Sequence, residues 1–429
     1  GYEKPLSVNS PKQLQEFFHS FLGLKEKRKR KKGADAATVS LDRAVLEALG
    51  QTYLIAEPFV KLVLAIRDAK KASSFAKTKF DADNRMRCNF NIAGTNTGRL
   101  SSSVSDMGTG TNLQNVNGRL KELFLADEGD VLFDIDLEQG DSRGVGAGAW
   151  EFFHDSHGPE WAGRYLDACE SGDLHTAVCR MAWPHLPWEN PDLEGKALAA
   201  YQRHEVAAQL CYREKSYRDM AKVLGHGTNY LGQPTTMSGH TKVPVDQISL
   251  FQHNYFQGFP CIKEWQNETI RRLQTTAQLT TLFGRRRYFW DDLDASSTIN
   301  AAIAYCPQSV TGEFCNRGIL QLQRVRNALD LPVKLHLQVH DSMVLGVRFK
   351  GVHETMREVM KALRVVRPLK GGRDFTIPHG FKMGWNYGSY DPETNPYGMK
   401  KYDPQEERTP PPARKSIYSL LDLPATSIR

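Results

Sequence analysis

The sequence predicts an α+β fold, and three observations support this prediction. Residues 130–140 (DVLFDIDLEQG) read as one buried strand, residues 333–349 as a β-hairpin, and helical patterns dominate residues 175–274. The chain has 429 residues, of which 40% are hydrophobic and 24% charged, which is enough for two or three subdomains with a sizeable core. The net charge of +7 is compatible with a polyanionic partner but does not identify one.

The cysteines and the apolar segments argue against several classes of protein. The seven cysteines are scattered and form no CxxC pair, which argues against a zinc site or a disulfide framework and fits a reducing compartment. No apolar run is long enough to cross a bilayer, and no signal peptide is visible. We therefore expect no membrane partner and a cytoplasmic location, with an organelle or the nucleus as alternatives.

The first part of the chain reads as helices around a basic run. Residues 10–24 have the pattern of a capped amphipathic helix, and two further helices are expected at 41–54 and 58–75. Seven basic residues fall at positions 25–32, interrupted only by Glu26. They can form a solvated loop, a localisation signal or a tip that follows phosphates.

The first buried strand ends in a carboxylate. Val131, Phe133 and Ile135 share one face of this strand. Asp134 and Asp136 share the other face. The pattern therefore predicts a strand with one side in the core and Asp136 near its end.

Three other segments have distinct patterns. The glycine-rich run GVGAGA at 144–149 lacks the spacing of a dinucleotide-binding loop, and we interpret it as a site of close packing. Residues 297–325 are a candidate for one long helix. Residues 389–429 are rich in proline and charge and are expected to form an extended tail, with a short docking segment at 416–423.

The second strand with a carboxylate lies in the stretch LQVHDSM. Alternation predicts that Leu335, Leu337 and Val339 share a buried face, and Asp341 is the next residue on that face. The chain is expected to turn back at His340 and Asp341. Burying an unpaired carboxylate costs several kcal/mol, roughly, so such a group is paired, neutralised or bound to a metal.

The two strand-end carboxylates suggest a cation site. If the two strands are neighbours in one sheet, Asp136 and Asp341 meet, and they repel each other unless a cation lies between them. Hard oxygen ligands favour Mg²⁺, particularly an ion that substrate phosphates also hold. Two such ions serve in-line phosphoryl transfer. Taken alone, both aspartates can equally be caps or surface turns.

A third element adds positive charge and aromatic rings. Arg218, Lys222, His226 and Tyr230 are spaced by four residues. On a helix the first three share a face, and Tyr230 trails at its edge. Such a face can hold a triphosphate and stack on a base, and Lys222 would be placed to donate a proton to departing pyrophosphate. An ordinary solvated basic face is the alternative.

A fourth element consists of TGRLSSS at 97–103 and TNLQNV at 111–116. Arg99 supplies a fork of donors, and the serines and asparagines supply short hydrogen-bonding side chains. These groups can grip sugars, phosphates and minor-groove acceptors without reading the base sequence. A serine-rich loop is the alternative.

Together, and in this order, the motifs resemble the polymerase domain of family A DNA polymerases of the bacterial and phage type, over about residues 7–387. The motifs DLHT, YFQGFP, TLFGRRR and CPQSVTGE extend the series. The resemblance implies a right-hand fold with an antiparallel palm sheet, helical fingers and a helical thumb. It implies these segments: thumb 1–96, palm 97–170 and 299–388, fingers 171–298, and the tail 389–429.

The resemblance also implies roles for single residues. Asp136, Asp341 and the backbone carbonyl of Leu137 match the ligands of two Mg²⁺ ions, for which Mn²⁺ is a substitute. Arg218, Lys222 and His175 match groups that contact the triphosphate. The remaining matches are Tyr230 at the template slot, His226 at the stacking position, Gln139 near the incoming nucleotide with Arg143 beneath it, Arg99 and Gln308 in the minor groove, His340 beside the primer terminus, and Asn115 and Arg285 on DNA.

The sequence departs from the family pattern at several of these positions. The glutamate that usually gates the sugar is Asp141, and the bulky apolar residue before it is Gly140. The usual stacking aromatic is His226, the usual glutamate after the last metal aspartate is Ser342, and a frequent upstream arginine is Asn300. These changes bear on nucleotide selectivity more than on the reaction.

The expected function is a template-directed DNA polymerase of replication or repair, acting as a monomer on primer–template DNA with dNTPs. A replisome partner on the tail is expected, and no carboxylate cluster of a proofreading exonuclease is visible. Two alternatives stay open. One is a relative of single-subunit RNA polymerases, or a ribonucleotide-tolerant enzyme, because His340, Asp341 and Ser342 also match the RNA enzymes. The other is a non-catalytic nucleic-acid-binding protein on a polymerase fold.

Overall fold

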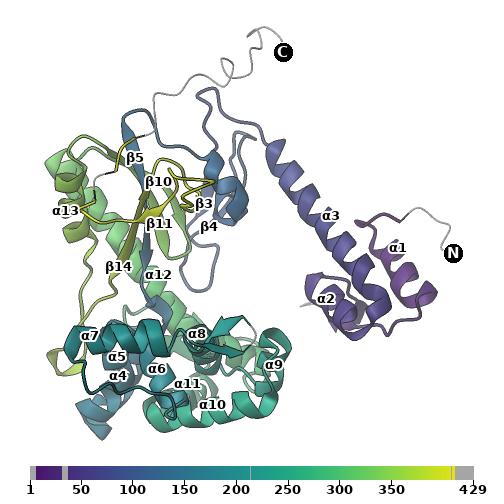
Figure 1. Ribbon diagram of the computed structural model, residues 1–429, viewed down its shortest axis with the longest axis horizontal. Helices are drawn as coiled ribbons and strands as arrows, with labels where there is room; N and C mark the ends of the chain where they lie inside the picture. Colours follow the sequence, from purple (N-terminus) through teal and green to yellow (C-terminus); the bar gives the residue numbers. More distant parts are fainter. Residues whose placement is uncertain (1–5, 31–36, 213, 407, 411–429) are drawn as a thin grey trace. The chain divides into compact units, whose positions relative to one another are not determined.

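The computed structural model describes residues 6–30, 37–212, 214–406 and 408–410. The chain divides into two compact units (Figure 1). The first unit comprises residues 1–89 and 103–112, and the second comprises residues 90–102 and 113–429.

The first unit is a small helical bundle. Its helices are α1 (Pro11–Gln15), continued by the π-helical turn η1 (Glu16–Phe21), then α2 (Arg43–Thr52), η2 (Leu54–Ala56) and α3 (Glu57–Ala76). Ser10 caps α1 by accepting a hydrogen bond from the backbone N–H of Gln13 at 3.3 Å. Leu14, Phe18 and Leu46 are fully buried between the helices. The three helices predicted in this region are therefore confirmed.

Two short hairpins complete this part of the chain. The basic run enters β1 (Arg28–Arg30), which pairs with β2 (Ala37–Val39). Residues 31 and 32 of the run lie outside the described residues. Strands β3 (Cys88–Asn91) and β4 (Ser101–Val104) form a hairpin that spans the boundary between the two units.

The second unit is built on a five-stranded sheet with the strand order β10–β11–β5–β14–β15. The strands are β5 (Asp130–Leu137), β10 (Val333–Val339), β11 (Ser342–Arg348), β14 (His379–Gly384) and β15 (Lys400–Lys401). All neighbours in this sheet are antiparallel. The central strand is β5, and Asp136 on it lies opposite Ser342 of β11 and Gly380 of β14.

One face of the sheet is covered by helices. Val131, Phe133 and Ile135 of β5 are fully buried in a core that also contains Phe314, as the alternation predicts. The helices of this layer are α4 (Gly140–His157), α12 (Ser296–Leu329) and α13 (Val352–Leu363). The predicted long helix is confirmed as α12, which contains Pro307 in its interior.

The region between α4 and α12 is mainly helical, as predicted. Its helices are α5 (Pro159–Glu170), α6 (Leu174–Ala182), α7 (Gly195–Tyr201), η5 (Gln202–Val206), α8 (Tyr217–Asn229), α9 (Pro234–Thr241), α10 (Val245–Gly258) and α11 (Pro260–Thr276). The short elements are η3 (Leu113–Asn115), η4 (Gly118–Leu123), β6 (Leu210–Tyr212), β7 (Lys215–Ser216), β8 (Gln278–Thr280), β9 (Arg286–Tyr288), β12 (Arg367–Pro368), η6 (Lys370–Gly372) and β13 (Asp374–Phe375). Tyr165, Tyr255 and Trp265 form the centre of a second core.

The glycine run of α4 is a site of close packing, as predicted. A Cβ atom on Gly144 would lie 3.0 Å from the Cα atom of Pro307 in α12. A Cβ atom on Gly146 would lie 3.0 Å from the Cα atom of Leu166 in α5. Both neighbours are backbone atoms that cannot turn away, so α4 can approach α5 and α12 only with glycine at these positions.

Gly144→Val is therefore expected to lower the free energy of unfolding by about 2–3 kcal/mol, because the added side chain overpacks the contact with Pro307. Chemical denaturation measures the change. Gly239→Val is the matched control, because Gly239 also lies in a helix and a Cβ there would have no neighbour within 4 Å. Equal effects of the two substitutions would contradict the packing role.

The predicted buried face of β10 is wrong. A bulge between Leu335 and Leu337 shifts the pairing of β10 with β11 by one residue. Since side chains alternate along a strand, the shift brings Gln338 into the interior and turns Leu337 to the opposite face, against the cluster of Leu132 and Val344. Leu335 lies before the bulge and is 43% exposed on this edge strand. The predicted reversal at His340 and Asp341 is confirmed, because these two residues form the turn between the strands.

The prediction of an extended tail from residue 389 is also wrong for its first part. Strand β15 pairs with Lys382 and Met383 of β14, and Tyr402 packs edge-on against Phe133 with ring centroids 5.1 Å apart. The predicted docking segment at 416–423 lies outside the described residues. Among the helices that the structure describes, none is both long and apolar enough to span a bilayer.

Candidate active site at the end of the central sheet

Two aspartates meet at one end of the central strands. Asp136 is the last but one residue of β5, and its neighbour on β11 is Ser342, which directly follows Asp341. The backbone N–H of Leu137 donates to the carbonyl oxygen of Asp341 at 3.3 Å. The two strands are therefore neighbours, which is the condition on which the predicted cation site depends.

The electrostatics of Asp136 favour a cation. Asp136 is exposed at the strand end, but the protein around it partly desolvates its carboxylate, and the negative charges of Asp341 and Asp134 add repulsion. Together these effects raise the pKa of Asp136 to about 6. A bound cation would relieve this repulsion. In the part of the chain that the structure describes, no group of three or more His, Cys, Asp or Glu side chains is placed to hold a metal alone. An ion here would need further ligands, such as substrate phosphates, which suits Mg²⁺.

Buried amides support the turn that carries Asp341. His340 has a left-handed backbone with φ of 55°, which is uncommon for a residue other than glycine. The side chain of Gln338 donates to the carbonyl of His340 at 2.6 Å. The side chain of Gln114 in turn donates to Oε1 of Gln338 at 3.0 Å. Because both glutamines are buried, the segment TNLQNV holds the turn from behind.

Asp141 is the centre of a second set of contacts. Its Oδ1 accepts hydrogen bonds from Arg99 and Thr311, both at 2.9 Å, and its Oδ2 accepts one from the hydroxyl of Tyr230 at 3.2 Å. The same guanidinium of Arg99 lies 3.8 Å from Oδ2 of Asp341. Arg99 therefore links Asp141 with the strand-end carboxylates. Thr311 was not singled out from the sequence, although it lies three residues after Gln308 on the same predicted helix.

The predicted basic helix is confirmed as α8. It begins with a capping box, in which the hydroxyl of Ser216 and the carboxylate of Asp219 each accept from the other's backbone N–H. Lys222 and His226 are exposed and Arg218 is half-buried. The residues on the opposite face are buried: Met220, Ala221, Leu224, Gly225 and Thr228.

Tyr230 is the residue that directly follows α8. Its ring lies over that of His226 with centroids 4.8 Å apart. Since the hydroxyl of Tyr230 reaches Asp141, the aromatic end of α8 lies beside the set of contacts around that carboxylate.

Arg218 is engaged by an aspartate at the start of α6. Its Nη2 donates to Oδ1 of Asp173 at 3.0 Å, and Asp173 also caps α6 through the N–H of Thr176. Burial, followed by the positive charges of Arg218 and Lys222, lowers the pKa of His175 to about 4. His175 is therefore neutral at pH 7, and it can donate a hydrogen bond to a phosphate but adds no charge. Asp173 was not given a role from the sequence, although DLHT has the pattern of a capped helix start.

The candidate DNA contacts lie on several elements. Asn115 on η3 and His340 at the turn are exposed. Gln308 on α12 is half-buried. Arg285 donates two hydrogen bonds to Oε1 of Glu313, one from Nη2 at 2.6 Å and one from Nε at 3.0 Å.

Gly98 in the segment TGRLSSS occupies a position that requires glycine. Gly98 has φ of 77°, and a Cβ atom there would lie 2.5 Å from the guanidinium carbon of Arg285. The carbonyl of Gly98 accepts from the side chain of Asn316 on α12 at 3.1 Å. The segment that carries Arg99 is therefore fixed against α12.

Two other predicted residues lie at the start of α4. Gln139 has φ of 55°, and its Oε1 is buried with no hydrogen-bond partner among the described residues. No contact among the described residues therefore satisfies this oxygen. Arg143 is buried and donates to the carbonyl of Cys169 at 2.8 Å, close to the end of α5. This contact joins α4 to the end of α5, and the expected role of Arg143 beneath the nucleotide stays a prediction.

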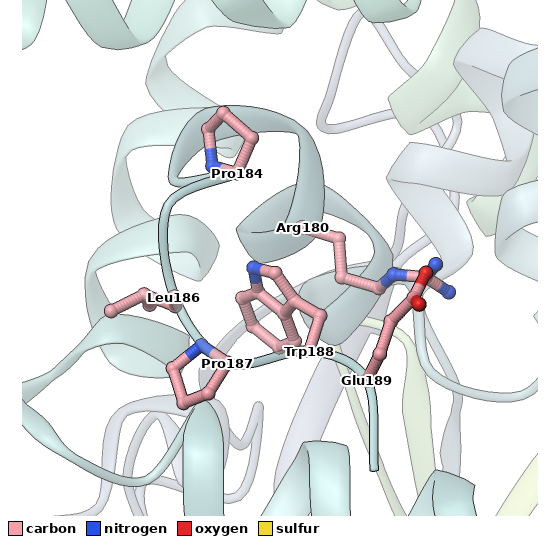
Figure 2. Close-up of a pocket in the computed structure, with 6 residues that line it drawn as sticks. All are labelled: Arg180, Pro184, Leu186, Pro187, Trp188 and Glu189. Atoms are coloured by element: carbon pink, nitrogen blue, oxygen red, sulfur yellow. The ribbon is translucent and has the colours of Figure 1, made fainter. Parts of the chain in front are cut away.

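A surface pocket of about 420 Å³ lies elsewhere, in the loop after α6. Figure 2 shows its lining, in which the ring of Trp188 lies at the centre between prolines on one side and Arg180 and Glu189 on the other. None of the lining residues belongs to the sets of contacts described above, so the pocket is not part of the candidate site.

Comparison with known proteins places the chain among polymerases. The model of DNA polymerase family A matches residues 2–145 and 199–385. A thermostable DNA polymerase I of Thermus thermophilus is 27% identical over 376 residues, which cover 84% of this chain and 40% of that protein. DNA polymerase I of Helicobacter pylori is 24% identical over 381 residues, which cover 85% of this chain and 36% of that protein. The chain thus spans about two fifths of the length of these relatives.

A solved structure shows the same fold. The polymerase domain of Pol1 from M. smegmatis, in complex with a DNA primer-template and dNTP, aligns with a TM-score of 0.66 at 20% identity. The alignment covers 89% of this chain and 61% of that chain. It confirms the predicted right-hand α+β polymerase fold. Since the family model matches most of the residues, the chain belongs to DNA polymerase family A.

Proposed function

We propose that this chain is a template-directed DNA polymerase that adds dNTPs to the 3′ end of a primer, in replication or repair. The observation that carries the proposal is that Asp136 and Asp341 meet at the end of the sheet. Contacts of Arg99, Asp141 and Tyr230 connect this end of the sheet with the basic helix α8. Such a site can hold a nucleotide between a metal-binding end and a phosphate-binding helix. The M. smegmatis relative, whose solved complex contains a primer-template and dNTP, supports the same partners.

The proposed cofactor is a pair of Mg²⁺ ions, for which Mn²⁺ is a substitute. Asp136, Asp341 and the backbone carbonyl of Leu137 would hold them together with phosphate oxygens. When bound, the ions supply Lewis-acid chemistry, which lowers the pKa of the primer 3′-hydroxyl and stabilises the charge on the leaving pyrophosphate. The raised pKa of Asp136 fits this role, because a cation stabilises the ionised carboxylates.

The chain's own groups would position the nucleotide. Arg218 and Lys222 bind the triphosphate, and Lys222 donates a proton to pyrophosphate as it leaves. His175 donates a hydrogen bond from its neutral ring. The remaining proposed contacts are those of His226 and Tyr230 with the base pair, Gln139 and Asp141 with the nucleotide, Arg99 and Gln308 with the minor groove, and His340, Asn115 and Arg285 with DNA.

We also propose thumb, palm and fingers segments at 1–96, at 97–170 with 299–388, and at 171–298. The two compact units do not follow the first of these boundaries, because residues 103–112 belong with residues 1–89. A monomeric state and a replisome partner bound through the tail complete the proposal.

Primer extension on a DNA template with Mg²⁺, run in parallel with dNTPs and rNTPs, tests this function. We expect extension with dNTPs. Extension with rNTPs alone would favour the RNA polymerase relative, and extension with both would indicate a ribonucleotide-tolerant enzyme. Binding of the primer–template without extension in any lane would favour the non-catalytic alternative.

A further inference from the structure

Thr311 is a fully buried residue of α12 whose hydroxyl reaches the candidate site. Its Oγ1 lies 2.9 Å from Oδ1 of Asp141 and 3.1 Å from the carbonyl oxygen of Pro307. A hydroxyl has one proton to donate, and the charged carboxylate is the stronger acceptor. Thr311 therefore donates to Asp141, and the carbonyl of Pro307 lies within reach as a second acceptor.

The methyl group of Thr311 occupies the space beside Gly140. A Cβ atom added to Gly140 would lie 2.6 Å from Cγ2 and 3.0 Å from Oγ1 of Thr311. Any larger residue at position 140 would therefore clash with Thr311 as it stands. The small residue before Asp141 and the threonine on α12 are complementary, because one leaves the volume that the other fills.

Asp141 lies where the sugar of a bound nucleotide would pass. On one side, Arg99 connects it with Asp341 and the metal-binding end of the sheet. On the other side, Tyr230 connects it with the end of α8, whose Arg218 and Lys222 would hold the phosphates. A nucleotide with its phosphates between these two ends and its base near Tyr230 presents its sugar to Asp141.

We propose that Thr311 is a positioning residue that sets discrimination between deoxyribose and ribose by fixing the carboxylate of Asp141. This inference rests on the proposed function. Arg99 and Thr311 hold Oδ1 while Tyr230 holds Oδ2, so the short side chain of Asp141 is kept in one orientation. Without the hydroxyl of Thr311, the carboxylate can turn away from the sugar and leave room for a 2′-hydroxyl.

The test compares Thr311→Val with Thr311→Ser. Valine keeps the shape of threonine and removes the hydroxyl, while serine keeps the hydroxyl. For each variant, kcat/KM is measured for one dNTP and the matching rNTP on the same primer–template. We expect the dNTP-to-rNTP ratio to fall about tenfold in Thr311→Val, in line with the loss of one hydrogen bond to a charged group, and to recover in Thr311→Ser.

A second pair of variants tests the complementarity with Gly140. Gly140→Ala alone should lower kcat/KM for the dNTP, because its Cβ meets Cγ2 of Thr311. Adding Thr311→Ser removes Cγ2 and should restore part of the loss. The dNTP-to-rNTP ratio is measured for both variants as well. If Thr311→Val fails to fold, a ratio that falls in Gly140→Ala, whose Cβ pushes against Thr311, and recovers with Thr311→Ser supports the inference, and an unchanged ratio overturns it.

The outcomes separate this inference from the proposed function. An active wild-type enzyme with an unchanged ratio in Thr311→Val, or with dNTP and rNTP activities that fall equally, would overturn the role of Thr311 alone. A wild-type protein that extends no primer would overturn the proposed function and with it this role.

Discussion

Replacing Asp136 or Asp341 with asparagine is expected to reduce the rate of primer extension by at least ~10³-fold, while affinity for the primer–template changes little. Asparagine keeps the shape of the side chain and removes the charge that would hold a divalent cation. Because the two aspartates lie at neighbouring strand ends and their charges interact, each substitution should disable the same site. Single-turnover extension and a duplex-binding titration measure the two quantities.

Asp134→Asn is the matched control for this prediction. Asp134 lies on the same face of β5, two residues before Asp136, and its neighbour across the sheet is Lys382 on β14. Asp134 is not a proposed metal ligand, so its substitution should change the rate of primer extension by less than about threefold. Such a change corresponds to less than about 1 kcal/mol of activation free energy. An Asp136→Asn variant that extends DNA at a near wild-type rate would show that the metal assignment is wrong.

The second large effect is expected for Lys222. Lys222→Ala should lower kcat by about 10²–10³-fold, because the proposed donor of a proton to pyrophosphate is lost. Lys222→Arg keeps the positive charge but donates a proton poorly, since the guanidinium pKa is above 12. The arginine variant should therefore retain KM for the dNTP while its kcat stays low.

Lys215→Ala is a suitable control, because Lys215 is exposed on β7 just before α8 and lies outside the proposed phosphate-binding face. Steady-state and single-turnover kinetics separate the two parameters. If Lys222→Arg restored kcat as well as KM, Lys222 would act through its charge alone, and the proton-donor role would be refuted.

Much of the local structure was predictable from short-range patterns. The alternation in β5, the capped helices of the first unit and the face of α8 follow from residues close together in the chain, where side-chain period and capping act directly. That β5 and β11 are neighbours depends on strand order, and no local pattern specifies it. From the sequence, a cation site could be predicted only on the condition that the strands of Asp136 and Asp341 are neighbours.

The features that were missed depend on single residues or on distant partners. One extra residue in β10 moved Gln338 into the interior and Leu337 to the opposite face, and alternation alone cannot place such a bulge. The contact of Thr311 with Asp141 joins two helices whose packing depends on glycines. The folded part of the tail follows from pairing with an edge strand, although its composition suggested an extended chain.

The ion pair between Arg218 and Asp173 has a consequence for which molecules can occupy the site. In the protein without nucleotide, the carboxylate of Asp173 accepts a hydrogen bond from the guanidinium of Arg218. Asp173 would therefore compete with a phosphate for this guanidinium. A ligand must offer Arg218 a stronger anion than one carboxylate, and a triphosphate carries several charges where a nucleoside carries none. If Arg218 binds the triphosphate as proposed, an uncharged nucleoside cannot displace Asp173 from it, so we expect the site to select charged nucleotides before any test of base pairing or sugar.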